Sequence, residues 1–294
     1  MKNHRDRSKL SRRDFLTTTA ASLGAAGLIG AGCKDGLMGK LGMKKEIPIG
    51  VQLYSVRSEC EKDLPGTVAK VAEMGYDGVE FAGYYDYSAP DLRKILDDNG
   101  LKCCGTHTQM TTLEPENLEA TIEFNQILGN RYLICPWLQP SDDDPKQAWL
   151  NYAKRFNEIA ERVEKEDMVV GYHCHAHDFH ALDSGEVPWD ILFGNTGKSV
   201  VMQIDTCNCM MGGGDPIAYL KKYPGRSQTI HLKEYSATKP DAILGEGDVP
   251  WDEVFALCES TGKTEWYIIE EEKDAYPPLE AVDLCLKNYQ NLRS

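Results

Sequence analysis

Eight short apolar runs rich in β-branched residues alternate with eight stretches of helical spacing from residue 47 to the end of the sequence. The apolar runs begin at Ile47, Gly78, Lys102, Tyr132, Met168, Ser199, Ser227 and Thr264. The helical stretches cover Leu64–Met74, Asp91–Asn99, Pro115–Leu128, Lys146–Lys165, Pro188–Phe193, Pro216–Tyr223, Trp251–Ser260 and Leu279–Leu292. Regular alternation of this kind predicts an α/β fold, a single (β/α)₈ barrel over residues 47–294. A doubly wound open sheet is the structural alternative.

Polar side chains able to bind a metal fall where the predicted strands end. In a parallel barrel these ends meet at one face, which carries the active site. The residues are Glu80, His107, His173, His175, Asp205, His231, Lys233 and Glu270. Burying such groups is costly unless they are paired or bound to a cation. The mixed His/Asp/His/Glu set therefore predicts one divalent ion, although any single member could be a satisfied core group. Mn²⁺ is our first expectation, with Zn²⁺, Co²⁺, Fe²⁺ or Mg²⁺ as alternatives, because imidazole is a poor ligand for Ca²⁺.

The first 33 residues differ from the rest of the chain. Basic residues precede a Ser-Arg-Arg-Asp-Phe-Leu sequence at 11–16, which leads into an apolar run of small residues from Thr17 to Gly32. This pattern predicts a twin-arginine export signal in residues 1–33 and a periplasmic or membrane-anchored protein. The stretch before Cys33 resembles a lipoprotein processing site, so a lipid anchor at Cys33 is the one membrane contact we expect; an unlipidated protein is the alternative. Residues 34–46 are Gly- and Lys-rich and predict a linker.

The charge of the chain narrows the choice of partners. The formal charge is −14, and removal of residues 1–33 takes away six basic and two acidic side chains and leaves −18. A domain this acidic repels phosphate backbones, so no nucleic acid partner is expected. The ten cysteines have irregular spacings and none of the paired spacing of a zinc site, which favours small core residues over disulfides.

Several short motifs together resemble the xylose-isomerase-like sugar phosphate isomerase/epimerase barrels, which include tagatose 3-epimerase relatives and endonuclease IV. The motifs are GVQLYSVR at 50–57, GYDGVE at 75–80, YHCH at 172–175, IDT at 204–206, HLKE at 231–234, LGEG at 244–247 and IE at 269–270. The resemblance covers residues 47–294. It implies a (β/α)₈ barrel, a small sugar substrate and one divalent ion; a homo-oligomer rests on this resemblance alone.

The resemblance also assigns roles to residues. It implies one metal ligand from each of the last four strands, and three of them match position by position as Asp205, His231 and Glu270. Epimerases of simple ketoses usually have a glutamate on the fifth strand, whereas this chain has His173 and His175. These two histidines point to the same side of a strand. We expect His173 to be the ligand and His175 the acid/base, and the reverse assignment stays open.

The chemistry implied by such a site is proton transfer next to a carbonyl. A divalent ion stabilises the enediolate formed when a base removes the neighbouring proton. The candidate bases are His175 and Glu270, and Lys233 is expected to neutralise a developing oxyanion. Glu80 and His107 are expected to bind sugar hydroxyls or act as the second acid/base. For Glu80 a structural ion pair is the alternative.

Four functions compete at this point. The first is a sugar isomerase or epimerase acting on a free sugar. The second is a lyase or hydratase that uses the same enolisation on a 3-keto-glycoside, which the strand-five histidines and the predicted export favour. The third, an endonuclease IV-like enzyme, needs more metal ligands and a basic face, and the acidic charge argues against it. The fourth is a non-catalytic carbohydrate-binding barrel.

Overall fold

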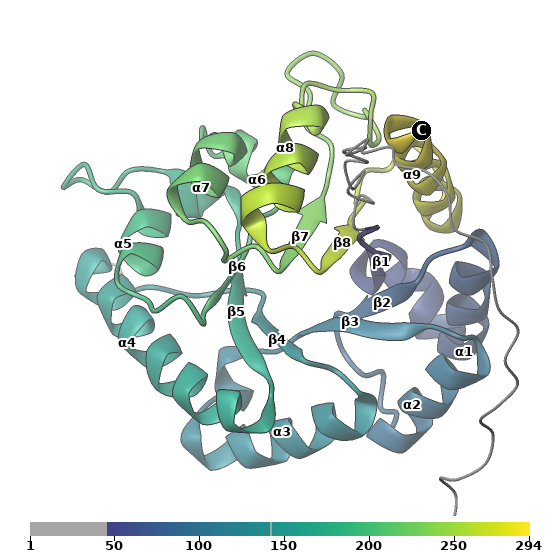
Figure 1. Cartoon of the computed structure of the whole chain (residues 1–294), viewed down its shortest axis with the longest axis horizontal. Helices are drawn as coiled ribbons and strands as arrows, with labels where there is room; N and C mark the ends of the chain where they lie inside the picture. The colour runs from purple at the N-terminus through teal and green to yellow at the C-terminus, as the bar shows by residue number, and fades with distance from the viewer. Residues whose placement is uncertain (1–45, 142) are drawn as a thin grey trace, which may run out of the picture. The chain divides into compact units, whose positions relative to one another are not determined.

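Eight parallel strands form a barrel in a computed structural model that describes residues 46–141 and 143–294 (Figure 1). The strands are β1 Ile49–Gln52, β2 Gly78–Phe81, β3 Lys102–His107, β4 Tyr132–Cys135, β5 Val169–His173, β6 Val201–Gln203, β7 Thr229–Leu232 and β8 Trp266–Ile269. The prediction of a (β/α)₈ barrel is therefore confirmed. The predicted export signal and, apart from Glu46, the predicted linker lie outside the described residues.

The barrel closes unevenly between its two end strands. The ladder runs β6-β5-β4-β3-β2-β1-β8-β7, and β1 pairs with both β2 and β8. Between β6 and β7 the structure has only an isolated bridge, which joins Asp205 to His231. The backbone N–H of His231 also donates to the carbonyl of Ile204 at 2.9 Å. Two predicted metal ligands thus lie at the closing seam.

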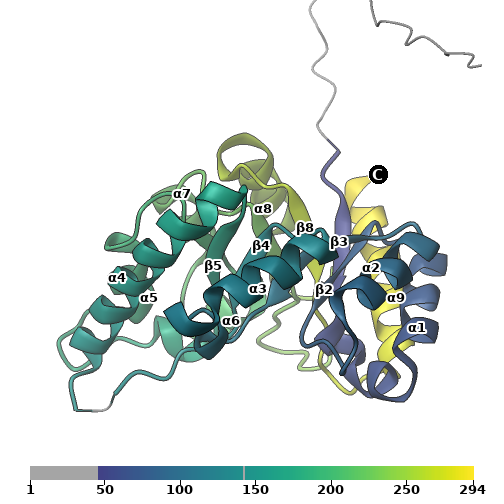
Figure 2. The ribbon, with the colours of Figure 1, turned by 90° about the horizontal axis from the view of Figure 1, so that it is seen from below.

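Helices surround the strands, and Figures 1 and 2 show α2 and α3 side by side over one part of the barrel. The helices are α1 Arg57–Met74, α2 Ala89–Asp98, α3 Pro115–Leu128, α4 Pro145–Val163, α5 Pro188–Gly194, α6 Thr206–Met211, α7 Pro216–Lys222, α8 Trp251–Leu257 and α9 Pro278–Arg293. Six of them have proline in the first turn, where its missing N–H costs no hydrogen bond, including α3 and α4.

Two helices differ from expectation. α1 begins seven residues earlier than predicted, but its backbone leaves the helical region at Asp63 (φ −160°, ψ 87°), two residues before Pro65. The predicted stretch is the part after this kink, which the proline accounts for. α6 was not predicted, because six residues are too few to show a helical period. Its start is fixed by Asp205, whose side chain accepts from the backbone N–H of Asn208 at 2.7 Å.

Local irregularity on β2 and β3 makes room for a buried carboxylate. The register between the two strands shifts between Val79 and Glu80. A Cβ atom on Gly105 of β3 would lie 2.3 Å from Oε1 of Glu80. Because only glycine leaves this space free, the sequence Gly105-Thr106-His107 permits the Glu80 side chain to lie inside the barrel wall.

The nine cysteines in the described part of the chain are buried and unpaired, as expected for small core residues. Among the residues that the structure describes, no helix has the length and apolar character needed to span a bilayer.

Candidate active site and metal centre

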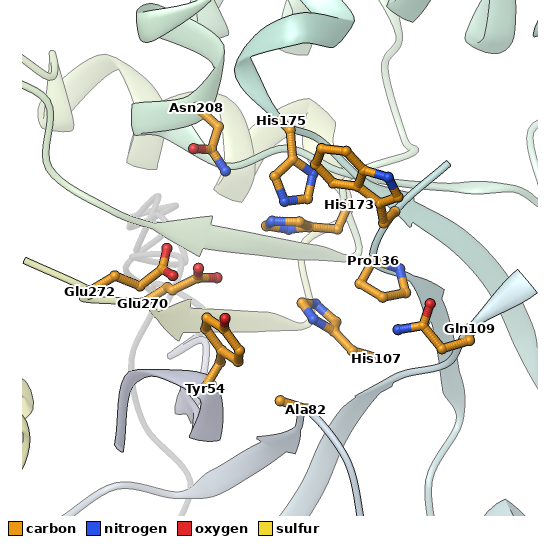
Figure 3. A pocket seen from close by; sticks show the side chains of 11 residues that line it. Tyr54, Ala82, His107, Gln109, Pro136, His173, His175, Asn208, Glu270 and Glu272 are labelled. Atoms are coloured by element: carbon orange, nitrogen blue, oxygen red, sulfur yellow. The ribbon is translucent and has the colours of Figure 1, made fainter. Parts of the chain in front are cut away.

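The sequence-predicted site residues gather at the carboxyl-terminal ends of the strands, around a pocket of about 380 Å³ (Figure 3). His107, His173, His175 and Glu270 line it. Residues that were not among the predicted site residues also line it: Tyr54, Ala82, Gln109, Pro136, Trp137, Asn208 and Glu272. This volume lies within the range of roughly 300–1,000 Å³ found for small-molecule sites. We call this cavity the catalytic pocket.

Four side chains from four consecutive strands converge below the pocket. One donor atom each from His173, Asp205, His231 and Glu270 lies within 4.8 Å of the others, and all four residues are buried. Nδ1 of His173 and Oδ2 of Asp205 are buried without a hydrogen-bond partner, and Nδ1 of His231 faces Oε2 of Glu270 at 2.5 Å. Buried polar atoms without a partner are costly, and a cation shared by the four residues removes that cost. The donor set fits a divalent transition metal.

The other ring nitrogen of His231 is held by Glu80. Nε2 of His231 lies 2.6 Å from Oε2 of Glu80. The Glu80 carboxylate also accepts from Nε2 of Gln52 at 2.7 Å and from Nε2 of Gln203 at 2.8 Å. Burial opposes ionisation of Glu80, but His107 and His231 outweigh it and lower the pKa of Glu80 below its usual value. A carboxylate in this position fixes the ring so that Nδ1 of His231 faces the other candidate ligands.

This arrangement corrects one expectation. Glu80 is fully buried and does not line the catalytic pocket, so its side chain is not placed to touch a substrate. It is a positioning residue for His231, as in the ion-pair alternative. Gln203 was not predicted as a site residue, although it lies two positions before Asp205 and so faces the same side of the chain. Its Oε1 lies 3.2 Å from Nε2 of His107.

Carboxylates outnumber cations around the candidate ligands. Nζ of Lys233 lies 3.1 Å from Oε1 of Glu270 and also contacts Glu272. Burial disfavours the charged amine, but Glu270, Asp205 and Glu272 raise the pKa of Lys233 well above its usual value. Burial raises the pKa of Asp205 to about 6, and neighbouring Glu270 contributes. The site therefore has negative charge for which a further cation is the natural partner.

His175 lies at the end of β5, beside His173 and separate from the four-residue cluster. The two rings are edge-to-face with centroids 5.0 Å apart. Burial lowers the pKa of His175 to about 4, so the ring is neutral at neutral pH and can accept a proton. The ring also packs edge-to-face on Trp137, an exposed residue of the pocket wall, with centroids 4.7 Å apart. His173 thus belongs to the four-residue cluster, and His175 lies beside it in the same pocket.

His107 forms another side of the pocket. Its ring stacks on that of His231, with centroids 5.5 Å apart and planes at 16°. In Figure 3, His107 lies with Ala82 and Gln109 on the side away from Glu272. Of the aromatic residues near strand ends, Tyr54 and Trp137 reach the pocket, whereas Trp251 is buried and donates from Nε1 to Glu234. Asn208, at the start of α6, is held at the pocket by its bond to the carbonyl of Cys174.

Comparisons with known proteins find relatives and solved structures similar to most of this chain. The rhizopine catabolism protein MocC of Rhizobium meliloti is 23% identical over 70% of this chain and 74% of its own length. An inosose dehydratase of Clostridium beijerinckii is also 23% identical, over 73% of this chain and 84% of its own. A crystal structure of a sugar phosphate isomerase/epimerase from Parabacteroides distasonis superposes with a TM-score of 0.72 at 20% identity, covering 85% of this chain and 97% of that one.

The sequence model of one family matches most of the barrel. It is described as the xylose isomerase-like TIM barrel, and the match spans residues 68–288. This range contains the four candidate metal ligands, together with His107, His175 and Lys233. The resemblance seen in the motifs is thereby confirmed, and the chain belongs to the xylose isomerase-like TIM barrel family.

Proposed function

We propose that this protein is a divalent-metal-dependent carbon–oxygen lyase that acts on a ring ketone of a sugar or cyclitol. The observation that carries the proposal is the cluster of four buried candidate ligands beside His175, a neutral base in the same pocket. The relatives named as inosose dehydratases favour a lyase over the isomerase that the motifs first suggested. Both reactions begin with removal of a proton next to a carbonyl.

His173, Asp205, His231 and Glu270 are the residues that would hold the ion. When bound there, a divalent cation supplies Lewis acidity that stabilises negative charge on a carbonyl oxygen. Lys233, 3.1 Å from Glu270, adds positive charge from the side of β7 and β8. Mn²⁺ remains our first choice of metal, and the sugar-sized pocket is lined by Tyr54 and Trp137, which suit the apolar faces of a ring.

The proposed reaction is a β-elimination. His175 takes the proton from the carbon beside the carbonyl, and the electron pair of that C–H bond is delocalised into the carbonyl group. The pair then forms a carbon–carbon double bond while the C–O bond on the next carbon breaks. The departing oxygen takes a proton from His107, the histidine on the other side of the pocket. The products are an α,β-unsaturated ketone and either water or an alcohol.

An isomerase or epimerase is the second candidate. The structural similarity to a sugar phosphate isomerase/epimerase favours it, and the same base and cation serve it. The two functions separate after the first step, because an epimerase returns a proton to the carbon and breaks no C–O bond. The non-catalytic barrel, our earlier alternative of another class, would have no need of a neutral base beside the cluster.

The test is an incubation of the metal-loaded protein in deuterated water with an inosose, a 3-keto-glucoside and free ketoses. NMR follows carbon-bound deuterium, and absorbance follows the unsaturated ketone. We expect C–O cleavage, slowed by about 10²–10⁴-fold in the His175→Gln variant with metal content unchanged. His180→Gln, a change at an exposed histidine beyond the strand end, is the matched control. Deuterium uptake without cleavage favours the epimerase, and no exchange with any substrate contradicts enolisation.

We also propose that the protein is exported by the twin-arginine route and is periplasmic or anchored through a lipid on Cys33. The Arg12-Arg13 pair and the apolar run after it support this proposal. Mass spectrometry of the mature N-terminus tests it, because an acylated Cys33 and a free signal-peptidase product differ in mass.

A further inference from the structure

A second cavity opens beside the catalytic pocket, between the ends of β2 and β3 and helix α3. Its volume is about 420 Å³. It shares three lining residues with the catalytic pocket, namely Ala82, His107 and Gln109. The remaining walls come from the loop after β2, the segment after β3 and one face of α3: Gly83, Tyr84, Thr108, Thr112, Asn117, Ala120, Thr121, Phe124 and Asn125. The two cavities therefore adjoin each other at His107.

The second cavity has two aromatic residues in its wall, Tyr84 and Phe124. The rings of Tyr84 and Phe124 lie with centroids 4.2 Å apart and planes at 32°. Phe81, at the end of β2, packs behind Tyr84 with centroids 6.3 Å apart. Two consecutive residues after Tyr84, Tyr85 and Asp86, have positive φ values of 51° and 62°. Backbone held in this region costs energy for non-glycine residues, so the loop that carries Tyr84 keeps a specific conformation.

The polar groups of its wall already have partners within the protein. The Asn125 side chain donates to the carbonyl of Thr121 at 2.9 Å, and its Oδ1 accepts from Thr106. The hydroxyl of Thr121 donates to the carbonyl of Thr112 at 2.7 Å. Among the described residues, no lining residue of this cavity has a buried polar side-chain atom without a partner, whereas His173 and His175 in the catalytic pocket do. A group that enters the second cavity thus gains most from apolar contact.

We propose that the second cavity binds the leaving group of the substrate, and that this group is an apolar, flat aglycone attached through a glycosidic oxygen to the ring that reacts. The inference rests on the proposed lyase function and deepens it by naming the substrate class: an aryl glycoside whose sugar ring has been oxidised to a ketone. The sugar ring occupies the catalytic pocket between Trp137 and Tyr54, and the aglycone lies past His107 against Phe124.

The chemistry follows without a further reactant. With the ketone two carbons from the glycosidic carbon, His175 removes the proton from the carbon between them. The C–H electron pair becomes the new carbon–carbon double bond, and the bond from the glycosidic carbon to its oxygen breaks. The aglycone oxygen takes a proton from His107 and leaves as a phenol. His107 borders both cavities, so it lies where this oxygen crosses from one to the other.

The test compares binding of phenyl glucoside and methyl glucoside by calorimetry, since neither compound carries the ketone and neither can react. The metal-loaded protein should bind the phenyl compound at least about tenfold more tightly, because a buried ring of this size contributes that much. Ala120→Phe fills the second cavity from α3 without touching the catalytic pocket. This variant should bind phenyl glucoside and methyl glucoside with affinities within about twofold of each other, and its affinity for methyl glucoside should be that of the unmodified protein. Ala256→Phe, on an exposed position of α8, is the matched control.

Phe124→Leu supplies a second variant that keeps apolar bulk and removes the flat ring; it should weaken phenyl glucoside severalfold and methyl glucoside not at all. Equal affinities in the unmodified protein, or a phenyl preference that survives Ala120→Phe, overturn the inference. The 3-keto derivatives of both compounds separate this from the lyase proposal. Tighter binding of the phenyl compound without release of phenol supports the cavity proposal and contradicts the lyase proposal. Release of phenol and methanol at equal efficiency, with equal binding of the two compounds, supports the lyase proposal and contradicts the cavity proposal.

Discussion

Replacement of Glu80 by Gln tests whether this carboxylate orients His231 for metal binding. Oε2 of Glu80 faces Nε2 of His231 at 2.6 Å and Nε2 of Gln52 at 2.7 Å, while Oε1 accepts from Nε2 of Gln203 at 2.8 Å. A glutamine has one oxygen and one NH₂ group. Turned one way, its NH₂ opposes His231 and Gln52; turned the other, it opposes Gln203. The second orientation loses the hydrogen bond from Gln203 and the negative charge, and it destabilises the folded protein less than the first.

In that orientation His231 keeps a neutral acceptor but loses the carboxylate that holds its ring. Loss of such a partner typically weakens metal affinity about 10- to 100-fold, which is about 1.4–2.7 kcal/mol. Competition for Mn²⁺ and Zn²⁺ against a chelator of known affinity measures this change. The substrate pocket is not altered, because Glu80 does not line it.

Glu234→Gln is the matched control, since it also neutralises a fully buried glutamate. Oε1 of Glu234 accepts from the backbone N–H groups of Tyr235 and Val249, and Oε2 accepts from that of Gly245 and from Nε1 of Trp251. Either orientation of a glutamine leaves two donors unpaired, so the free energy of unfolding should fall by about 2–6 kcal/mol. Metal affinity should stay near that of the unmodified protein. If Glu80→Gln binds metal within about twofold of the unmodified protein, Glu80 has no orienting role.

Three further outcomes are expected. Removal of the metal by a chelator should lower Tm by about 5–10 °C, because a metal present at about 100 times its Kd adds about 2.7 kcal/mol to the free energy of unfolding. An unchanged Tm in a calorimetric scan contradicts a bound ion. Gly105→Ala should cost about 1–3 kcal/mol in urea unfolding, because its Cβ would lie 2.3 Å from Glu80, whereas Gly194→Ala, with 4.0 Å to its nearest neighbour, is the control that should change little. Burial raises the pKa of Asp178 to about 7, above its unfolded value, so this group's contribution to stability falls as pH rises from about 4 to about 7. The free energy of unfolding of the unmodified protein minus that of Asp178→Asn should therefore be more positive at pH 5 than at pH 8. An equal difference at the two pH values contradicts the raised pKa.

The positions of the candidate metal ligands could be predicted from the sequence because two independent patterns, the apolar runs and their eightfold alternation with helices, agree on them. Each candidate ligand follows an apolar run of strand length, and the eightfold alternation says that all such ends meet on one face. His173 ends β5, and His231 lies in β7. Asp205 lies two residues after the end of β6, and Glu270 directly follows β8. A barrel with the right number of repeats thus leaves little freedom in where these side chains can be.

The role of Glu80 could not be predicted, because it depends on contacts between strands that are far apart in sequence. Its direction follows from the register shift beside it and from the missing Cβ of Gly105, and its partners Gln52 and Gln203 come from β1 and β6. The second cavity was missed for a related reason. Its walls are ordinary residues of α3 and of two loops, and only their packing leaves a space between Phe124 and His107.

The candidate metal centre lies at the seam where the barrel closes, so a bound ion would affect both the reaction and the closure of the barrel. Along the seam between β6 and β7, the described strands share no ladder, and Asp205 and His231 form the isolated bridge. A cation held by these two side chains would cross-link the seam in addition to its role in the reaction. The carboxylates that would hold the cation oppose closure without one, since Oδ2 of Asp205 is buried without a hydrogen-bond partner. Loss of metal should therefore loosen β6 and β7 first, and the loss of Tm on chelation should appear as early hydrogen exchange in these two strands.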